Sequence, residues 1–219
     1  GGNLVQPMSF LYITGGFLTR AGEFVHPKTW DELPPRVGED RFPVWRELVD
    51  EAQSIHLPFQ IQSGKPYPIK ALIGFGLNYR MWPDSNFMRE SLEKLDFFVN
   101  VDLFRTDSCQ YADIILPACS SVERSELRCY AQRYVIYTQP VIEPLGESRD
   151  DASIIIDLAE RLGLDDPLFR QGYEACLDWI LEPSGLKIEE LKKHPGGMPL
   201  PQPLKIAEKK YSQKGFATP

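Results

Sequence analysis

The sequence predicts an α/β fold in which a mostly parallel sheet is flanked by helices, with irregular segments at both ends of the chain. Three short apolar runs, "IKALIGFG", "DFFVNV" and "ADIILPA", each end at glycine, proline or polar residues. Near-continuous apolar runs of this kind are typical of strands that are covered on both faces of a parallel sheet. Segments with apolar residues at helical spacing follow the first run and the third. Together these features indicate a Rossmann-like core.

The predicted core spans residues 69–164. "IKALIGFG" is its first strand, and the glycines at the end of that strand lead into a helix that Asp84 or Ser85 can cap. The apolar face of this helix is formed by Phe87, Leu92 and Leu95. "DFFVNV" and "ADIILPA" supply the second and third strands, and "VIYTQPVI" is a candidate for a further strand.

A second helix ends the predicted core. Asp150 or Asp151 can cap its N-terminus, and Gly163 provides a stop signal. Its apolar stripe consists of Ile154, Ile155, Leu158 and Leu162. Both helices therefore have a face that the sheet can bury.

The segments outside the core contain many prolines. Residues 1–68 are predicted to form a connector or insertion that packs on the core, with room for one short helix at Val44–Ser54. Residues 165–219 contain a predicted helix at Tyr173–Leu181 and a shorter one at Ile188–Lys193. A stretch rich in proline and glycine, "HPGGMPLPQPL", follows them.

Composition excludes several classes of function. The 219 residues are 42% hydrophobic and carry a net charge of −7 with scattered basic residues, so no nucleic-acid partner is expected. No apolar run approaches the ~20 residues that span a bilayer, so we expect a soluble chain without membrane contact. The four cysteines form no CxxC pair and only three histidines are present, so no metal ligand is predicted. A hydrolytic triad lacks members, and no catalytic residue is predicted.

The loops after the predicted strands contain the candidate binding residues. In a parallel sheet, ligands bind outside the carboxyl ends of the strands. Gly74 and Gly76 permit close backbone approach to a phosphate, Asn78 offers donors and acceptors, and Asp102 follows at a spacing that suits a ribose contact. "GFGLNY" lacks the third glycine of the dinucleotide fingerprint, so a simple strand-to-helix turn remains an alternative. Glu123 and Glu126 are interpreted as a solvated face rather than a catalytic pair.

The segment "KLDFFVNVDLFRTDSCQYADIILPACSSVERSE" resembles the molybdopterin-dependent oxidoreductases of the dimethyl sulfoxide reductase type, which include formate dehydrogenases and nitrate reductases. The matching features are a strand that ends in Asp102, a turn with Thr106, the run from Ala112 to Pro117, and Glu123. "LYITGGFLTRAGE", "GFGLN", "PVIEPLGESRDDASIIIDLAERLG" and "KGFATP" resemble further segments of the family in the same order. Tyr79 stands where the family usually has proline, and Ser108 and Cys109 replace a usual Thr and Ala.

The resemblance implies a molybdopterin guanine dinucleotide cofactor, with molybdenum or tungsten, in an enzyme of anaerobic respiration. It also implies a prokaryotic protein of the cytoplasm or periplasm. The residues that it implies for binding the cofactor are Gly74, Gly76, Asn78, Asp102, Phe104, Thr106, Pro117 and Glu123. The four-cysteine cluster loop, the metal ligand and the C-terminal domain of such enzymes are not found in the sequence. We therefore expect an internal piece of a larger enzyme, inactive alone, whose partners are the remaining domains of the parent and an iron–sulfur electron-transfer subunit.

Two alternatives are kept open. One is a stand-alone nucleotide-binding or regulatory module without redox chemistry. The other is a flavodoxin-like or NAD-type oxidoreductase that uses the same sheet, against which the incomplete glycine fingerprint counts.

Overall fold

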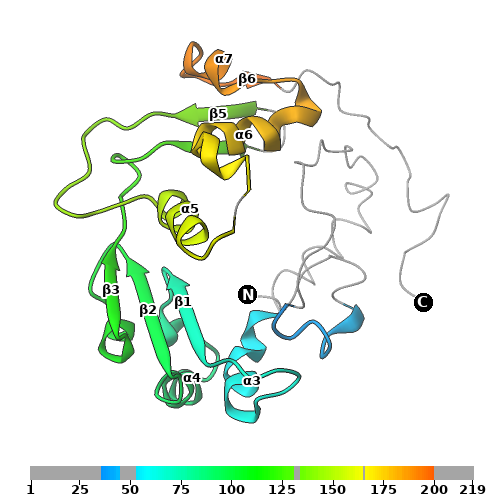
Figure 1. The fold of residues 1–219 in the computed structure, drawn as a ribbon, viewed down its shortest axis with the longest axis vertical. Helices are drawn as coiled ribbons and strands as arrows, with labels where there is room; N and C mark the ends of the chain where they lie inside the picture. Colours follow the sequence, from blue (N-terminus) through cyan, green and yellow to red (C-terminus); the bar gives the residue numbers. More distant parts are fainter. Residues whose placement is uncertain (1–35, 45–52, 131–133, 165, 200–219) are drawn as a thin grey trace, which may run out of the picture. The chain divides into compact units, whose positions relative to one another are not determined.

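The computed structural model describes residues 36–44, 53–130, 134–164 and 166–199 (Figure 1). The chain divides into two compact units. The larger unit comprises residues 30–126 and 138–176, and the smaller one comprises residues 1–29, 127–137 and 177–219. The binding residues expected from the sequence all belong to the larger unit.

A three-stranded parallel sheet forms the centre of the larger unit. Its strands are β1 (Ala71–Phe75), β2 (Phe97–Asp102) and β3 (Ile114–Pro117), and they lie in the order β1-β2-β3. The register pairs Ala71 with Phe97 and Val99 with Ile114. These strands coincide with the three apolar runs, so the predicted α/β fold with a parallel sheet is confirmed.

The connections between the strands differ in length. After β1 come the 3-10 turn η3 (Tyr79–Met81) and helix α4 (Ser85–Leu92), whereas β2 is followed only by the 3-10 turn η4 (Asp107–Tyr111). Asp84 caps α4, since its carboxylate accepts a 2.9 Å hydrogen bond from the amide of Phe87. The prediction of a cap at Asp84 or Ser85 is thus confirmed for Asp84.

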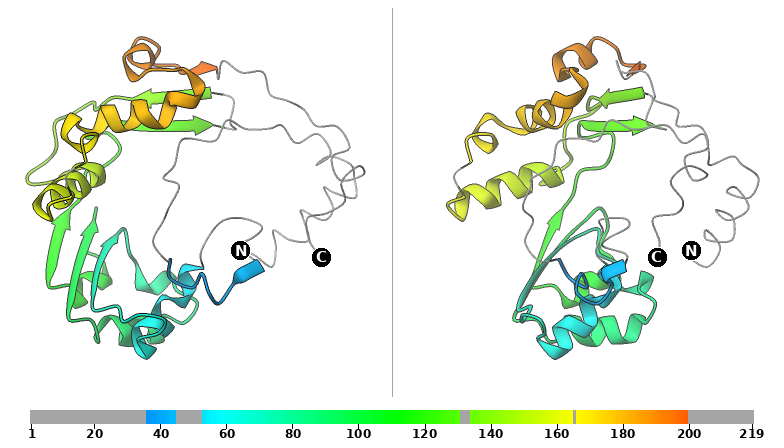
Figure 2. Two further views of the ribbon diagram at one scale, coloured as in Figure 1. Left: turned by 45° about the vertical axis from the view of Figure 1, so that its right-hand side comes forward. Right: turned by 90° about the vertical axis from the view of Figure 1, so that its right-hand side faces the viewer.

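One face of the sheet packs on α4 and on helix α3 (Leu57–Ser63), which lie beside each other (Figures 1 and 2). The core here consists of Leu57, Ile61, Tyr79, Met88, Leu92 and Phe98. Helix α3 was not predicted, because its proline was taken as a helix breaker. Pro58 lies in the first turn, where a missing N–H costs nothing, and the 3-10 turn η2 (Ser54–His56) precedes it. Most of the predicted helix Val44–Ser54 lies outside the described residues.

Helix α5 (Asp151–Arg161) borders the opposite face of the sheet. Asp150 is its N-cap and accepts a 2.9 Å hydrogen bond from the amide of Ser153, and Gly163 has a positive φ of 74° just after the helix. The segment before α5 runs beside the end of β3. The amide of Arg149 donates to the carbonyl of Pro117 at 3.1 Å, and the amide of Cys119 donates to the carbonyl of Arg149 at 2.9 Å. The 3-10 turn η5 (Phe169–Gln171) follows α5.

A second three-stranded sheet has the order β4-β5-β6, with strands β4 (Glu126–Tyr130), β5 (Tyr134–Thr138) and β6 (Met198–Pro199). Strand β6 pairs antiparallel with β5. The predicted strand "VIYTQPVI" is shorter than expected, since β5 ends at Thr138, and β4 was not predicted. Helices α6 (Tyr173–Leu181) and α7 (Ile188–Lys192) agree with the two predicted helices, and the 3-10 turn η6 (Glu182–Ser184) between them was not predicted.

Among the described residues, no helix combines the length and apolar character needed to cross a membrane.

Candidate functional site

Three loops meet at the carboxyl edge of the parallel sheet. They follow β1, β2 and β3, and the strand register holds them side by side, with Phe75 opposite Val101 and Asp102 opposite Pro117. The amide of Gly76 donates to the carbonyl of Val101 at 2.8 Å, which extends the pairing by one residue into the first loop. This edge therefore gathers residues that are far apart in the sequence.

The two glycines of the first loop have different roles. A Cβ added to Gly74 would lie 2.7 Å from the Cβ of Leu77, so the chain needs a glycine there for its own packing. Gly76 has a φ of +61°, and a Cβ added to it would meet nothing within 4 Å. The backbone at Gly76 thus borders open space that a ligand can enter.

Asn78 organises the turn after Gly76. Its side-chain oxygen accepts a 3.1 Å hydrogen bond from the amide of Arg80 and so caps η3. The guanidinium of Arg80 pairs with the carboxylate of Asp107, and this contact raises the pKa of Arg80 above its usual value. Because Asp107 belongs to η4, the ion pair links the loop after β1 to the loop after β2.

Asp102 ends the central strand with a half-buried carboxylate. One oxygen accepts a 3.4 Å hydrogen bond from the amide of Phe104, and the other accepts a 3.4 Å hydrogen bond from the hydroxyl of Thr106. Both bonds are long, so this carboxylate keeps acceptor capacity for a ligand. The turn that it holds exposes the side chain of Phe104 to 77%.

Both oxygens of the Glu123 carboxylate accept hydrogen bonds from groups of the same chain. One oxygen accepts hydrogen bonds from the amide and the hydroxyl of Ser120, and the other accepts from the amide of Leu145 at 2.7 Å and the hydroxyl of Ser148 at 3.2 Å. These donors, led by the hydroxyl of Ser120, lower the pKa of Glu123 to about 2. Glu123 is 8% exposed, so its interpretation as part of a solvated face is wrong.

The structure therefore gathers the predicted residues in two groups. Gly76, Asn78, Asp102, Phe104 and Thr106 surround the ends of β1 and β2, whereas Pro117 and Glu123 belong to the loop after β3. Sequence reasoning missed Arg80, Asp107 and Ser108, which join the first two loops, and Leu145 and Ser148, which hold Glu123. These contacts bridge 22 to 29 residues, and no local pattern signals them.

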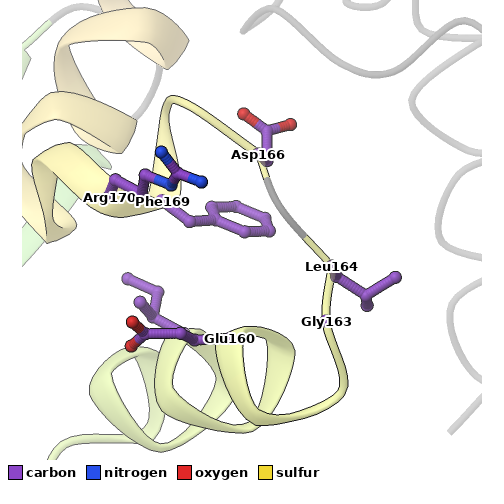
Figure 3. Close-up of a pocket in the computed structure, with 7 residues that line it drawn as sticks. Glu160, Gly163, Leu164, Asp166, Phe169 and Arg170 are labelled. Atoms are coloured by element: carbon purple, nitrogen blue, oxygen red, sulfur yellow. The ribbon is translucent and has the colours of Figure 1, made fainter.

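Two hollows of the larger unit lie beside helix α5, and the first of them also reaches Pro117. One, of about 560 Å³, separates the sheet from α5 and is lined mainly by apolar side chains, among them Ile73, Val99 and Leu158. The other, of about 430 Å³, lies between the end of α5 and η5, where Figure 3 shows Glu160 and Phe169 beside the open space. In the described ranges, no group of three or more histidine, cysteine or carboxylate side chains is arranged to hold a metal.

Comparison with known proteins identifies several relatives. A family model described as molybdopterin oxidoreductase matches residues 38–161. Probable oxidoreductase YoaE of Bacillus subtilis (strain 168) is 31% identical over 171 residues, which are 68% of this chain and 25% of that protein. Trimethylamine-N-oxide reductase of Pasteurella multocida (strain Pm70) is 32% identical over 117 residues, which are 52% of this chain and 14% of that enzyme.

A solved structure is similar as well. Acetylene hydratase from Pelobacter acetylenicus superposes with a TM-score of 0.57 at 28% sequence identity, covering 65% of this chain and 20% of that one. The chain thus spans a quarter or less of the length of these relatives. The segment that the family model matches includes all three strands and the loops at their carboxyl ends.

Proposed function

The chain belongs to the molybdopterin oxidoreductase family, and from that premise we propose that its larger unit binds the nucleotide end of a molybdopterin guanine dinucleotide at the carboxyl ends of β1, β2 and β3. When bound, this cofactor carries the metal at which the family's redox chemistry takes place. The residues of this chain bind and orient the distant, nucleotide end of it. No redox step is assigned to them.

The observation that carries the proposal is the carboxylate of Asp102. It lies at the end of the central strand, and its two intramolecular hydrogen bonds are long. A carboxylate with free acceptor capacity suits a pair of adjacent donors, and the N1–H and N2–H groups of guanine provide such a pair. The neighbouring Phe104 offers an exposed ring on which a base can stack.

The remaining residues fit the rest of a nucleoside diphosphate. The backbone at Gly76 borders open space, as the close approach of a phosphate requires, and Asn78 follows it with a side chain able to donate. Thr106 keeps the turn after Asp102 in place. Gly74 in β1 and Glu123 after β3 act through the backbone conformation that they permit, and Pro117 ends β3 opposite Asp102.

The parent protein is proposed to be an oxidoreductase of which this chain forms one part. The other domains would supply the metal ligand, and an iron–sulfur subunit would carry electrons. The relatives differ in the reaction named for them, since they include both a reductase and a hydratase. The isolated chain is expected to show no turnover, and the parent is assigned to the cytoplasm or periplasm.

The test is a titration of the 219-residue chain with GDP, ADP and CDP, in which calorimetry measures the binding of each nucleotide. We expect GDP to bind more tightly than the other two, and Asp102→Ala to abolish that preference. Asp96→Ala is the matched control, because Asp96 is an exposed carboxylate at the opposite end of β2. Equal binding of the three nucleotides, or equal behaviour of the two variants, would contradict the proposal.

A stand-alone nucleotide-binding module would also bind GDP, so a second measurement separates the two functions. The protein isolated at its native length from its source is analysed for molybdenum, tungsten and released guanine nucleotide. Metal and nucleotide together support the cofactor site. Guanine nucleotide without either metal would indicate the module instead, and bound flavin would indicate a flavodoxin-like protein.

A further inference from the structure

A buried hydrogen bond joins the loops after β1 and β2. The amide of Tyr79 donates to the hydroxyl of Ser108 at 3.0 Å, across 29 residues of sequence. Ser108 is 0% exposed and Tyr79 is 7% exposed, so water does not compete for this contact. Tyr79 begins η3 and Ser108 lies in η4, and the bond therefore fixes one short turn against the other.

The two turns carry the two halves of the proposed binding site. Gly76 lies three residues before Tyr79, and Asp102 lies at the end of the strand that leads to Ser108. A nucleotide that touches both the backbone at Gly76 and the carboxylate of Asp102 needs them at a fixed separation. Ligand contacts held in place before binding cost less ordering when the ligand arrives.

Two other contacts join the same turns. The ion pair between Arg80 and Asp107 is exposed, with side chains that are 63% and 43% accessible, and such pairs are weak and screened by salt. The rings of Tyr79 and Tyr111 meet edge to face with centroids 5.7 Å apart. Of the polar contacts between these turns in the described residues, only the one at Ser108 is buried.

We propose that Ser108 is a positioning residue, whose hydroxyl holds the amide of Tyr79 and thereby sets the distance between the backbone of Gly76 and the carboxylate of Asp102. This inference rests on the proposed function of the site. Ser108 itself does not touch the nucleotide. It determines what fraction of the molecules presents both loops in the binding arrangement.

The chain offers a matched control. Ser91 is also 0% exposed, and its contacts lie away from the two turns. Its hydroxyl donates to the carbonyl of Phe87 at 2.7 Å within α4 and lies 3.3 Å from the carbonyl of Pro58, and it accepts a 3.1 Å hydrogen bond from the side-chain amide of Gln62 in α3. Replacing either serine by alanine removes one buried hydroxyl. Only the change at Ser108 leaves a buried amide of the first loop without its acceptor.

The experiment compares Ser108→Ala with Ser91→Ala in the 219-residue chain by amide hydrogen exchange and by GDP titration. We expect both variants to melt a few degrees earlier. Only Ser108→Ala should speed exchange at Tyr79 and weaken GDP binding about tenfold, because the apparent dissociation constant rises as the competent fraction falls. Raising the salt concentration should leave the wild-type exchange rate at Tyr79 unchanged.

Each outcome decides the question. If Ser108→Ala binds GDP as tightly as Ser91→Ala does, the positioning role is overturned, even if amide exchange at Tyr79 is faster in Ser108→Ala. Absence of GDP binding by the wild type overturns the proposed function and the positioning role with it, whereas the exchange data still show whether the two turns are coupled. If Ser108→Ala does not fold, Ser108→Cys keeps the shape with a weaker acceptor, and wild-type GDP affinity in that variant overturns the proposal.

Discussion

Phe98 and Asp113 exchange two hydrogen bonds at the start of their strands. The amide of Phe98 donates to the carboxylate of Asp113 at 2.7 Å, and the amide of Asp113 donates to the carbonyl of Phe98 at 2.8 Å. This pairing fixes the register in which Val99 lies opposite Ile114. A shift of one residue would turn every side chain of β3 to the other face. The position of Pro117 opposite Asp102 therefore depends on a contact at the far end of both strands.

Removing the carboxylate of Asp113 should loosen this register. We expect Asp113→Ala to lower the free energy of unfolding by about 1–3 kcal/mol, because the amide of Phe98 loses a charged acceptor. Asp113→Asn keeps an acceptor oxygen and should lose less. Urea denaturation followed by circular dichroism measures both. Equal stability of Asp113→Ala and the wild type would show that the register does not depend on this side chain.

The carboxylate of Glu123 should stabilise the protein in a pH-dependent way. The pKa of Glu123 in the folded protein is about 2, below its ordinary value of 4.5. Its contribution to stability is therefore complete above about pH 4.5 and is lost as the pH falls toward 2. Glu123→Gln should lower the melting temperature at pH 7 and much less at pH 3. Glu93→Gln, at an exposed position after α4, serves as the control. If the difference in melting temperature between the wild type and Glu123→Gln stays constant from pH 7 to pH 3, the lowered pKa of Glu123 is contradicted.

The two glycines of the first loop should respond differently to alanine. Gly74→Ala places a Cβ 2.7 Å from the Cβ of Leu77 and should destabilise the fold by about 1–3 kcal/mol. Gly76→Ala meets no atom but needs a left-handed backbone, which costs about 1 kcal/mol. In a GDP titration, Gly76→Ala should lose more affinity for GDP than Gly74→Ala does, although it loses less stability. If Gly76→Ala loses more stability and less GDP affinity than Gly74→Ala, the nucleotide does not enter the open space beside Gly76.

Helix α5 should depend on its N-cap. Asp150 accepts hydrogen bonds from the amide of Ser153 at 2.9 Å and from its hydroxyl at 2.5 Å. We expect Asp150→Ala to lower the free energy of unfolding by about 1 kcal/mol. Asp151→Ala removes a neighbouring carboxylate that pairs with Arg124 at 3.5 Å and should cost less. Chemical denaturation of the two variants decides the order, and a larger loss in Asp151→Ala would refute the cap.

Local signals predicted much of this architecture. The apolar runs before Asp102 and Pro117 became β2 and β3, and Asp84 and Asp150 cap the helices that their positions indicated. These features depend on neighbours within a few residues, so one sequence contains them. Pro58 was misleading because proline breaks a helix when it lies in the interior but is tolerated in the first turn, where Pro58 lies.

The candidate site was less accessible to sequence reasoning. The loops were found because strand ends are recognisable, but the roles of individual residues were not. The hydrogen bonds that hold Glu123 could not be predicted, since Leu145 and Ser148 reach it only in the folded chain. Gly74 and Gly76 look alike in the sequence and differ in the folded chain, where only Gly76 has a left-handed backbone and only Gly74 has a neighbour in the way of a Cβ.

The order β1-β2-β3 has a consequence for biosynthesis. Each strand pairs with the one made just before it, and Ala71 meets Phe97 and Val99 meets Ile114 across short stretches of chain. Contacts between residues close in sequence form early, so we expect this sheet to assemble while the ribosome is still adding the following residues. The edge that carries Asp102 then exists before Leu145 and Ser148 have emerged to hold Glu123. We therefore expect the nascent protein to complete this edge of the sheet from the loops after β1 and β2 toward the loop after β3.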